Sequence, residues 1–195
     1  MPPAPRILVF AGSLRRDSFN KKLARVAADA VRAAGGEATL VDLAEFPMPL
    51  YDGDIETAQG IPENGRRFKK LMMEHHGLFI ASPEYNSSIS GVLKNTIDWA
   101  SRQEKGETAL QCFDGKVAAL CSASTGALGG LRGLVTVRSI LGNIRVLVLP
   151  EQIAISKANE AFTEEGKLKD AKQQATLEAI AKRLVTVVAS LRAGA

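Results

Sequence analysis

The chain has 195 residues, 46% of them hydrophobic and 24% charged, which is typical of a globular protein that can bury a substantial core. The formal net charge of +4 comes from basic residues interleaved with acids, without the clustering that a nucleic-acid-binding surface needs. No apolar run approaches the roughly 20 residues of a membrane helix and no signal peptide is visible, so we expect no membrane insertion and a cytoplasmic location.

The first element is a short apolar run, Arg6–Ala11, which predicts a buried strand. A polar loop follows it and leads into a helix whose apolar residues recur at helical spacing from Leu23 to Ala34. The loop offers short hydrogen-bonding side chains and two guanidinium groups: Ser13, Ser18, Asn20, Arg15 and Arg16. The first amides of a helix are unpaired and attract anions, so this arrangement favours a phosphate site. The alternative is that Ser18 only caps the helix and that the arginines are solvated.

A second polar loop follows the apolar run Leu78–Ala81 and precedes a helix predicted near Gly91–Arg102. Pro83 fixes its own backbone and restricts the residue before it. The loop also provides the Tyr85 ring, an amide side chain and free backbone groups, which together suit a flat heteroaromatic ligand with donors and acceptors on its edge. The alternative is a simple turn before a capped helix, with Trp99 in the core.

Further strands and helices alternate along the chain. We predict the remaining strands at Glu37–Asp42, Val117–Cys121 and Val146–Leu149. We predict the remaining helices near Glu63–His75, Gly129–Leu141 and Thr163–Leu191, the last with Leu177, Ile180, Leu184, Val188 and Leu191 on one face. This alternation predicts an α/β fold in which helices cover both sides of a parallel sheet. The longest loop is expected at Phe46–Pro62, and no linker or repeat divides the chain, so residues 1–195 should form a single domain.

Motifs of other functional classes are missing or incomplete. Only Gly12 stands where a Gly-x-Gly-x-x-Gly fingerprint would begin, and the chain lacks the Gly-x-x-x-x-Gly-Lys-[Ser/Thr] loop of nucleotide triphosphatases. The adjacent His75 and His76 point to different sides of a helix, so we expect surface or helix-end residues and no metal site. Cys112 and Cys121 make neither a disulfide framework nor a metal site, and Cys121 ends an apolar run that should be buried.

Three motifs together carry a family resemblance. They are Gly12-Ser-Leu-Arg-x-x-Ser-x-Asn20, Ser82-Pro-Glu-Tyr-Asn-x-Ser-x-x-Gly-x-Leu-Lys-Asn-x-Ile-Asp-Trp99 and Ser122-Ala-Ser-Thr-Gly-Ala-Leu-Gly-Gly-Leu-Arg132. In this order, from about residue 6 to residue 150, the chain resembles the NAD(P)H-dependent FMN reductases, a family that includes quinone, chromate and azo-dye reductases. Ser90 stands where that family often has proline, and we expect this change to loosen the turn. Thr96, where alanine is common, is a mild change on a helix.

The resemblance implies a flavodoxin-like fold, a three-layer, doubly wound sheet of five parallel strands in the order 2-1-3-4-5. Ligands bind where the winding of such a sheet switches, which in this order is between strands one and three. The first two polar loops follow those two strands, so they should lie at one site. The resemblance also implies non-covalent FMN, with its phosphate on Ser13, Arg15, Ser18 and Asn20 beside Phe19, and its ring against Pro83, Glu84, Tyr85, Asn86 and Ser88 on one side and Ser122, Ser124 and Gly126 on the other.

The activity that the resemblance implies is the two-electron, ping-pong reduction of a small-molecule acceptor by NADPH or NADH. Quinones, flavins, azo dyes and metal oxyanions are all possible acceptors, and FMN rather than a catalytic residue would carry the chemistry. Two other functions stay open: a flavodoxin-type electron carrier, although such carriers are usually acidic, and a non-enzymatic flavin-binding redox regulator. The family also forms homodimers or homotetramers, and the helix Leu131–Ile144 has apolar residues on more than one side, one of which is a candidate subunit contact.

Overall fold

Five parallel strands form the centre of the structure, a computed structural model that describes residues 3–194. The strands are β1 (Arg6–Ala11), β2 (Glu37–Asp42), β3 (Gly77–Ala81), β6 (Val117–Ala123) and β7 (Leu147–Ile155). They lie in the order β2-β1-β3-β6-β7, and every pairing is parallel. Strands β4 (Glu84–Tyr85) and β5 (Ser88–Ile89) form a separate small hairpin, so β6 and β7 are the fourth and fifth strands of the sheet. The predicted order 2-1-3-4-5 is therefore confirmed.

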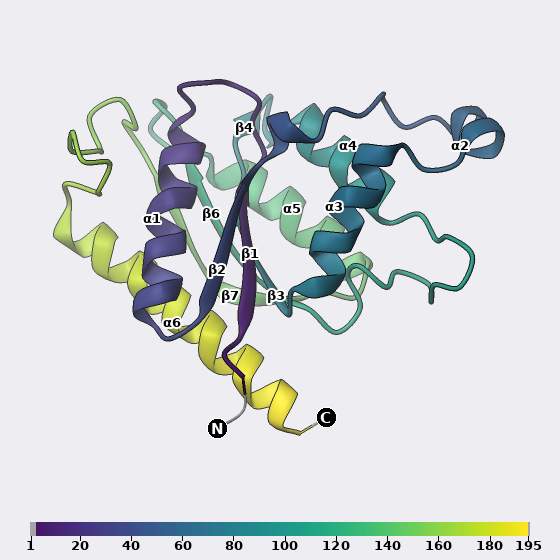
Figure 1. The fold of residues 1–195 in the computed structure, drawn as a ribbon. Helices are drawn as coiled ribbons and strands as arrows, with labels where there is room; N and C mark the ends of the chain where they lie inside the picture. Colours follow the sequence, from purple (N-terminus) through teal and green to yellow (C-terminus); the bar gives the residue numbers. More distant parts are fainter. Residues whose placement is uncertain (1–2, 195) are drawn as a thin grey trace.

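Helices cover both faces of the sheet (Figure 1). They are α1 (Phe19–Ala33), α2 (Gly53–Gln59), α3 (Glu63–Glu74), α4 (Gly91–Ala100), α5 (Leu131–Asn143) and α6 (Ala171–Ala193), with a short 3₁₀ turn at Leu43–Glu45. Helices α1 and α6 pack on one face, and α3, α4 and α5 pack on the other, each face with its own cluster of buried apolar side chains. Figure 1 shows both chain ends on the side of the molecule opposite the loop that follows β1.

The three central strands are buried on both sides. Every residue of β3 and β6 is buried, and so is every residue of β1 except Arg6. This burial explains why the strands read as continuous apolar runs rather than as alternating patterns, as is usual for parallel sheets with two covered faces. The carboxyl ends of these strands consequently bring their following loops together at one edge of the sheet.

The last helix begins at Ala171, later than the predicted start near Thr163. Gly166 has a φ of +82°, a left-handed conformation that belongs to a turn rather than to a helix. The Asp170 side chain then accepts hydrogen bonds from two N–H groups of the first helical turn, and this N-cap fixes the start. The prediction was also wrong for Leu191, which is 50% exposed and does not belong to the buried face.

Strand β7 extends past its predicted end at Leu149 to reach Ile155. Pro150 cannot donate to the ladder, and the pairing with β6 shifts register between Ala118 and Leu120. A bulge of this kind is tolerated because β7 lies at the edge of the sheet. The proline therefore interrupts the strand without ending it.

The predicted loop Phe46–Pro62 contains the short helix α2 and is fastened to α4. The Asn95 side chain accepts from the Tyr51 N–H at 2.7 Å and donates to the Pro49 carbonyl at 2.9 Å. The indole N–H of Trp99 donates to the same carbonyl at 2.8 Å, and Trp99 is fully buried, as expected for a core residue. These motif residues thus hold a distant loop in place.

His75 is a helix-end residue, as predicted, but it is buried rather than on the surface. Its two ring nitrogens lie 2.7 Å from the Leu71 carbonyl and 2.7 Å from the Thr39 hydroxyl. Because a carbonyl only accepts, Nδ1 carries the proton and Nε2 accepts from the hydroxyl.

Both cysteines are buried free thiols, and burial raises the pKa of Cys112 to about 11 and that of Cys121 further.

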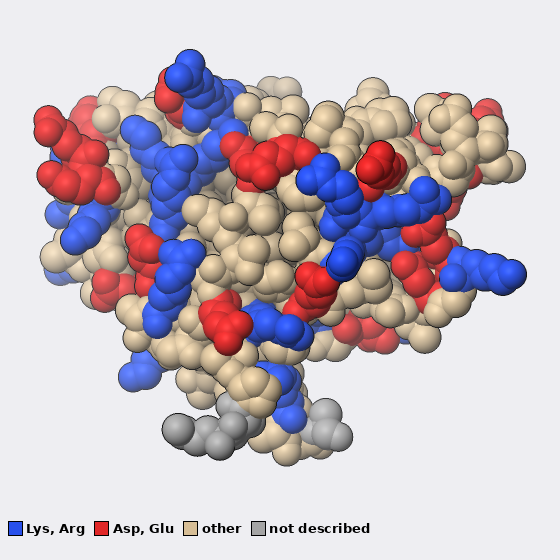
Figure 2. All heavy atoms as spheres, in the orientation of Figure 1, with Lys and Arg blue, Asp and Glu red and all other residues tan. Residues whose placement is uncertain are grey.

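Acidic and basic side chains are interspersed on the face of the molecule in Figure 2, without a continuous basic stripe. Within residues 3–194, no helix has the combination of length and apolar character that crossing a membrane requires.

Candidate functional site

Three loops, one after each of β1, β3 and β6, enclose a cavity of about 200 Å³ at the carboxyl edge of the sheet. We call it the loop cavity. The predicted site residues that line it are Ser13, Arg15, Ser18, Phe19, Asn20, Pro83, Glu84, Tyr85 and Ser124. Ala123 and Thr125 also line the loop cavity. Both belong to the motif after β6, but nothing in their side chains predicted them as site residues. The cavity lies at the switch point of the sheet, where ligands of such folds bind.

One end of the loop cavity is the N-terminus of α1. Ser18 is the N-cap residue and is 4% exposed, yet its side chain makes no capping hydrogen bond. The first turn of α1 contains no acidic residue. By contrast, the N-cap side chains of α2, α4 and α6 all accept bonds from their own helices. The start of α1 therefore keeps unpaired N–H groups and partial positive charge, which suits an anion.

Ser13 and Arg15 complete this end of the cavity. Ser13 is buried, and its hydroxyl accepts from the Arg15 N–H at 3.3 Å. The Arg15 side chain is exposed and forms no ion pair with any residue in the range 3–194. A guanidinium group that forms no ion pair, close to the unpaired N–H groups of a helix N-terminus, is a suitable partner for a phosphate group.

Asn20 lines the loop cavity and also binds the protein backbone. Its side-chain amide donates to the Ala123 carbonyl at 2.8 Å and accepts from the Ala123 N–H at 3.0 Å. This pair of bonds ties the first turn of α1 to the end of β6, across 103 residues of sequence. Asn20 therefore joins two walls of the loop cavity, and one amide proton remains for a ligand.

The loop after β3 is a small β-hairpin, which the sequence pattern does not predict. Strands β4 (Glu84–Tyr85) and β5 (Ser88–Ile89) pair antiparallel through a two-residue turn. The turn residues Asn86 and Ser87 have φ values of +50° and +64°, the left-handed region that tight hairpins use and that asparagine tolerates. Asn86 and Ser88 do not line the loop cavity, whereas Tyr85 lines it and remains 49% exposed.

Glu84 anchors the hairpin to α5. Its carboxylate contacts the Arg132 guanidinium at 2.6 Å and accepts from the Gly133 N–H at 3.2 Å. Burial acts to raise the pKa of Glu84, but these hydrogen bonds outweigh it and hold the pKa below its usual value. The Arg132 partner lies 48 residues away in the sequence, so this ion pair joins two distant segments.

The loop after β6 places its predicted residues in three different environments. Ser124 lines the loop cavity, and its hydroxyl accepts from the exposed Gly126 N–H at 3.3 Å. Ser122 is fully buried, and its hydroxyl has no hydrogen-bond partner. It lies directly beneath Gly130, where an added Cβ would come within 1.9 Å of the hydroxyl oxygen. Neither Ser122 nor Gly126 lines the cavity.

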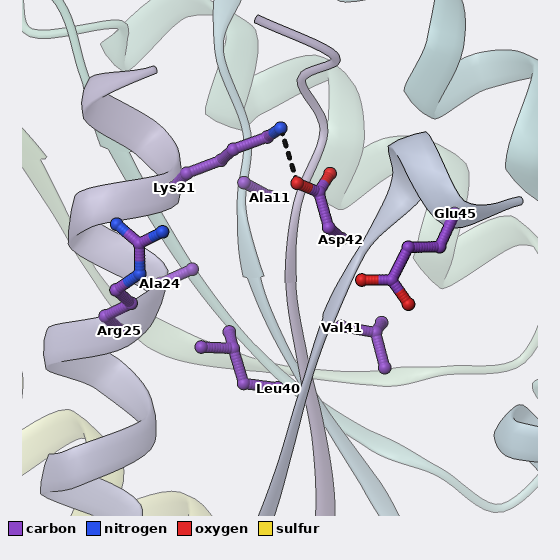
Figure 3. A pocket seen from close by; sticks show the side chains of 8 residues that line it. All are labelled: Ala11, Lys21, Ala24, Arg25, Leu40, Val41, Asp42 and Glu45. Atoms are coloured by element: carbon purple, nitrogen blue, oxygen red, sulfur yellow. Dashed lines mark hydrogen bonds and ion pairs between the residues drawn. The ribbon is translucent and has the colours of Figure 1, made fainter. Parts of the chain in front are cut away.

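A second hollow, of about 250 Å³, lies between α1 and the end of β2 (Figure 3). Lys21 and Asp42 face each other there, with 2.6 Å between Nζ and Oδ2. Burial acts to raise the pKa of Asp42, but the hydrogen bonds from Lys21 and from the Ala44 N–H outweigh it and hold the pKa below its usual value. Asp42 neutralises Lys21, and Glu45 faces Arg25 across the hollow with a second carboxylate. This hollow is therefore less suited to an anion than the loop cavity.

The hydrogen-bond donors around the loop cavity suit a flavin mononucleotide. The start of α1 offers hydroxyls, free N–H groups and one guanidinium to the phosphate. The hairpin offers a proline and an exposed tyrosine, with backbone groups beside a flat ring. Ser18 is largely buried, but its hydroxyl makes no capping hydrogen bond and so remains available to a ligand.

Comparisons with known proteins identify the family of this chain. Residues 5–160 match the family model described as NADPH-dependent FMN reductase. An NAD(P)H-dependent FMN reductase of Pseudomonas aeruginosa is 36% identical over 188 residues, which cover 96% of this chain and 97% of the relative. A quinone reductase of Pseudomonas putida is 34% identical over 189 residues, 96% of each chain. The solved structure of FerB, a flavoenzyme NAD(P)H:(acceptor) oxidoreductase from Paracoccus denitrificans, superposes with a TM-score of 0.81 at 26% identity, covering 95% of this chain and 98% of that one. The chain therefore belongs to the NADPH-dependent FMN reductase family.

Proposed function

We propose that this protein is an NAD(P)H-dependent FMN oxidoreductase that passes two electrons to quinones or to similar small acceptors. The observation that carries the proposal is the convergence of three loops on one cavity with an uncapped, cationic helix start. The names of the relatives support it, since they include an FMN reductase and a quinone reductase that match 96% of the chain.

In this proposal the start of α1 binds the phosphate. Ser13 and Ser18 contribute hydroxyls, the first turn of α1 contributes N–H groups, and Arg15 contributes charge. Asn20 acts mainly by holding Ala123, and so keeps the α1 wall and the β6 wall at a fixed separation. Bonds within the protein that restrict the walls of the site lower the entropy cost of binding.

The hairpin and the loop after β6 bind the ring. When bound, FMN supplies the hydride and electron chemistry. Pro83, Glu84 and Tyr85 present mainly backbone groups on one side, and Ser124 and Thr125 lie on the other. Backbone N–H groups of these loops would stabilise negative charge at the edge of the ring. The exposed Tyr85 borders an open face that a nicotinamide donor and a flat acceptor can occupy in turn.

An electron carrier and a non-enzymatic regulator have less support. The relatives that match nearly the whole chain are named as reductases, and no feature of the described structure favours a partner-binding role over turnover.

We also propose that residues 1–195 act as a single FMN-binding domain within a homodimer or homotetramer. Leu134, Val137 and Leu141 fill the core side of α5, but Leu131 and Val135 are 42% and 64% exposed. Apolar side chains on the outer face of a helix suit a subunit contact. Light scattering on the purified protein gives the mass directly, and a monomer at micromolar concentration would contradict this part of the proposal.

The proposed activity is tested by steady-state oxidation of NADPH or NADH with a soluble benzoquinone, using the FMN-loaded protein and the same protein stripped of FMN. We expect quinone-dependent turnover only with FMN. An FMN-loaded protein without turnover would leave a carrier or regulator as the better account.

A further inference from the structure

Ser90 lies at the junction between the hairpin and α4, and its hydroxyl joins two parts of the site. It is 5% exposed and is the N-cap residue of α4. Its Oγ donates to the Gly12 carbonyl at 2.6 Å and accepts from the Leu93 N–H at 3.2 Å. The expectation that serine at this position loosens the turn was therefore wrong. A proline here could make neither side-chain bond.

Gly12 is bound to the same segment through both of its backbone polar groups. Its N–H donates to the Ala81 carbonyl at 3.0 Å, while its carbonyl accepts from Ser90. A Cβ on Gly12 would lie 2.9 Å from the Leu93 Cβ, so only glycine allows this close packing against α4. The start of the phosphate loop is thus fixed to the segment that carries the hairpin.

The Ser90 bond also determines how Ser13 is presented. The Gly12–Ser13 peptide unit is planar, so the direction of its carbonyl fixes the direction of its N–H. Ser90 holds the carbonyl, and the Ser13 N–H donates to the Ala11 carbonyl at 2.8 Å. Ser13 in turn accepts from the Arg15 N–H. One buried hydroxyl therefore orients the turn that presents Ser13 and Arg15, two of the four predicted phosphate ligands.

We propose that Ser90 is a positioning residue for the FMN phosphate, a role that rests on the proposed function. Ser90 does not line the loop cavity, so its role would be indirect. Its bond to the Gly12 carbonyl restricts the Gly12–Ser13 turn within the protein itself. Less conformational entropy is therefore lost when FMN binds. Loss of the hydroxyl should therefore weaken the binding of the phosphate end and leave the binding of the ring unchanged.

The test compares the affinity of the apoprotein for FMN with its affinity for riboflavin, which has the ring but no phosphate, by quenching of flavin fluorescence. Ser90→Ala removes both bonds of the hydroxyl. Ser90→Gly removes them while retaining most of the helix-capping preference, and so serves if Ser90→Ala does not fold. We expect both variants to bind FMN about tenfold more weakly and riboflavin as the wild type does.

Thr96→Ala is the matched control. Thr96 is a buried hydroxyl residue on the same helix, but its hydroxyl bonds only to the Val92 carbonyl within α4. It should change thermal stability without changing the ratio of the two affinities. Unchanged FMN affinity in the Ser90 variants, or an equal loss for both flavins, would overturn the proposal. Failure of the wild type to bind FMN would instead refute the proposed function.

Discussion

Replacing Arg15 with alanine isolates the phosphate contact from the rest of the site. The Arg15 side chain is exposed and forms no ion pair within the described part of the chain. Its removal should therefore leave folding nearly unchanged. A hydrogen bond to a charged group contributes about 1.5–3 kcal/mol, and the exposed position favours the lower end. Because about 1.4 kcal/mol corresponds to tenfold in affinity, Arg15→Ala should weaken FMN binding by about tenfold.

The assay is a titration of the apoprotein with FMN and with riboflavin, followed by turnover measured at saturating FMN. Arg15→Ala should lose affinity for FMN alone and retain the turnover of the wild type once saturated. Arg16→Ala is the matched control, because Arg16 is also exposed and adjacent in sequence but does not line the loop cavity. Equal FMN affinities for the wild type and Arg15→Ala, or equal losses for the two variants, would refute the assignment.

Three other predictions concern stability and reactivity. Lys69→Ala should lower the free energy of unfolding by about 3 kcal/mol in a urea titration without changing FMN affinity, because it leaves Glu107 without its buried partner at 2.5 Å. Burial lowers the pKa of His76 to about 4, and its ring accepts from the Arg6 N–H. The unfolded chain therefore binds this proton more tightly, so stability is full above pH 6.5 and falls as the pH drops towards 4. His76→Gln should reduce that slope in melting temperatures, and an unchanged slope would contradict the assignment. Finally, the native protein should resist alkylation at both buried thiols at pH 8, and rapid labelling by iodoacetamide would show that burial does not protect them.

The sequence predicts the sheet well because its signals are local and strong. The central strands are uninterrupted apolar runs, and each is followed by a polar loop and a helical pattern. The errors occur where weak local signals meet tertiary context. The segment after Thr163 is compatible with a helix, but the turn at Gly166 and the cap at Asp170 delay the start of α6. Pro150 suggests the end of a strand, yet an edge position allows β7 to continue past it through a bulge.

The site is predicted as a set of loops but not as a set of contacts. The position of polar residues after successive strands indicates which loops meet. It does not indicate that Asn20 binds the Ala123 backbone or that Ser90 binds the Gly12 carbonyl, because these partners lie 103 and 78 residues apart. Such bonds depend on the distances that the folded sheet imposes. The sequence therefore suggests Asn20 as a phosphate ligand, which stays a prediction, but does not reveal that Asn20 also joins two walls of the cavity.

The measurement that tests the central claim most directly is the visible absorbance spectrum of the purified protein, recorded anaerobically before and after addition of NADPH. The account predicts the bands of oxidised flavin, retained through gel filtration or restored by added FMN, and their loss when NADPH is added. A subsequent addition of benzoquinone should restore them. A protein that binds no FMN would contradict the assignment of the loop cavity, and bound flavin that NADPH and NADH leave oxidised would contradict the reductase function.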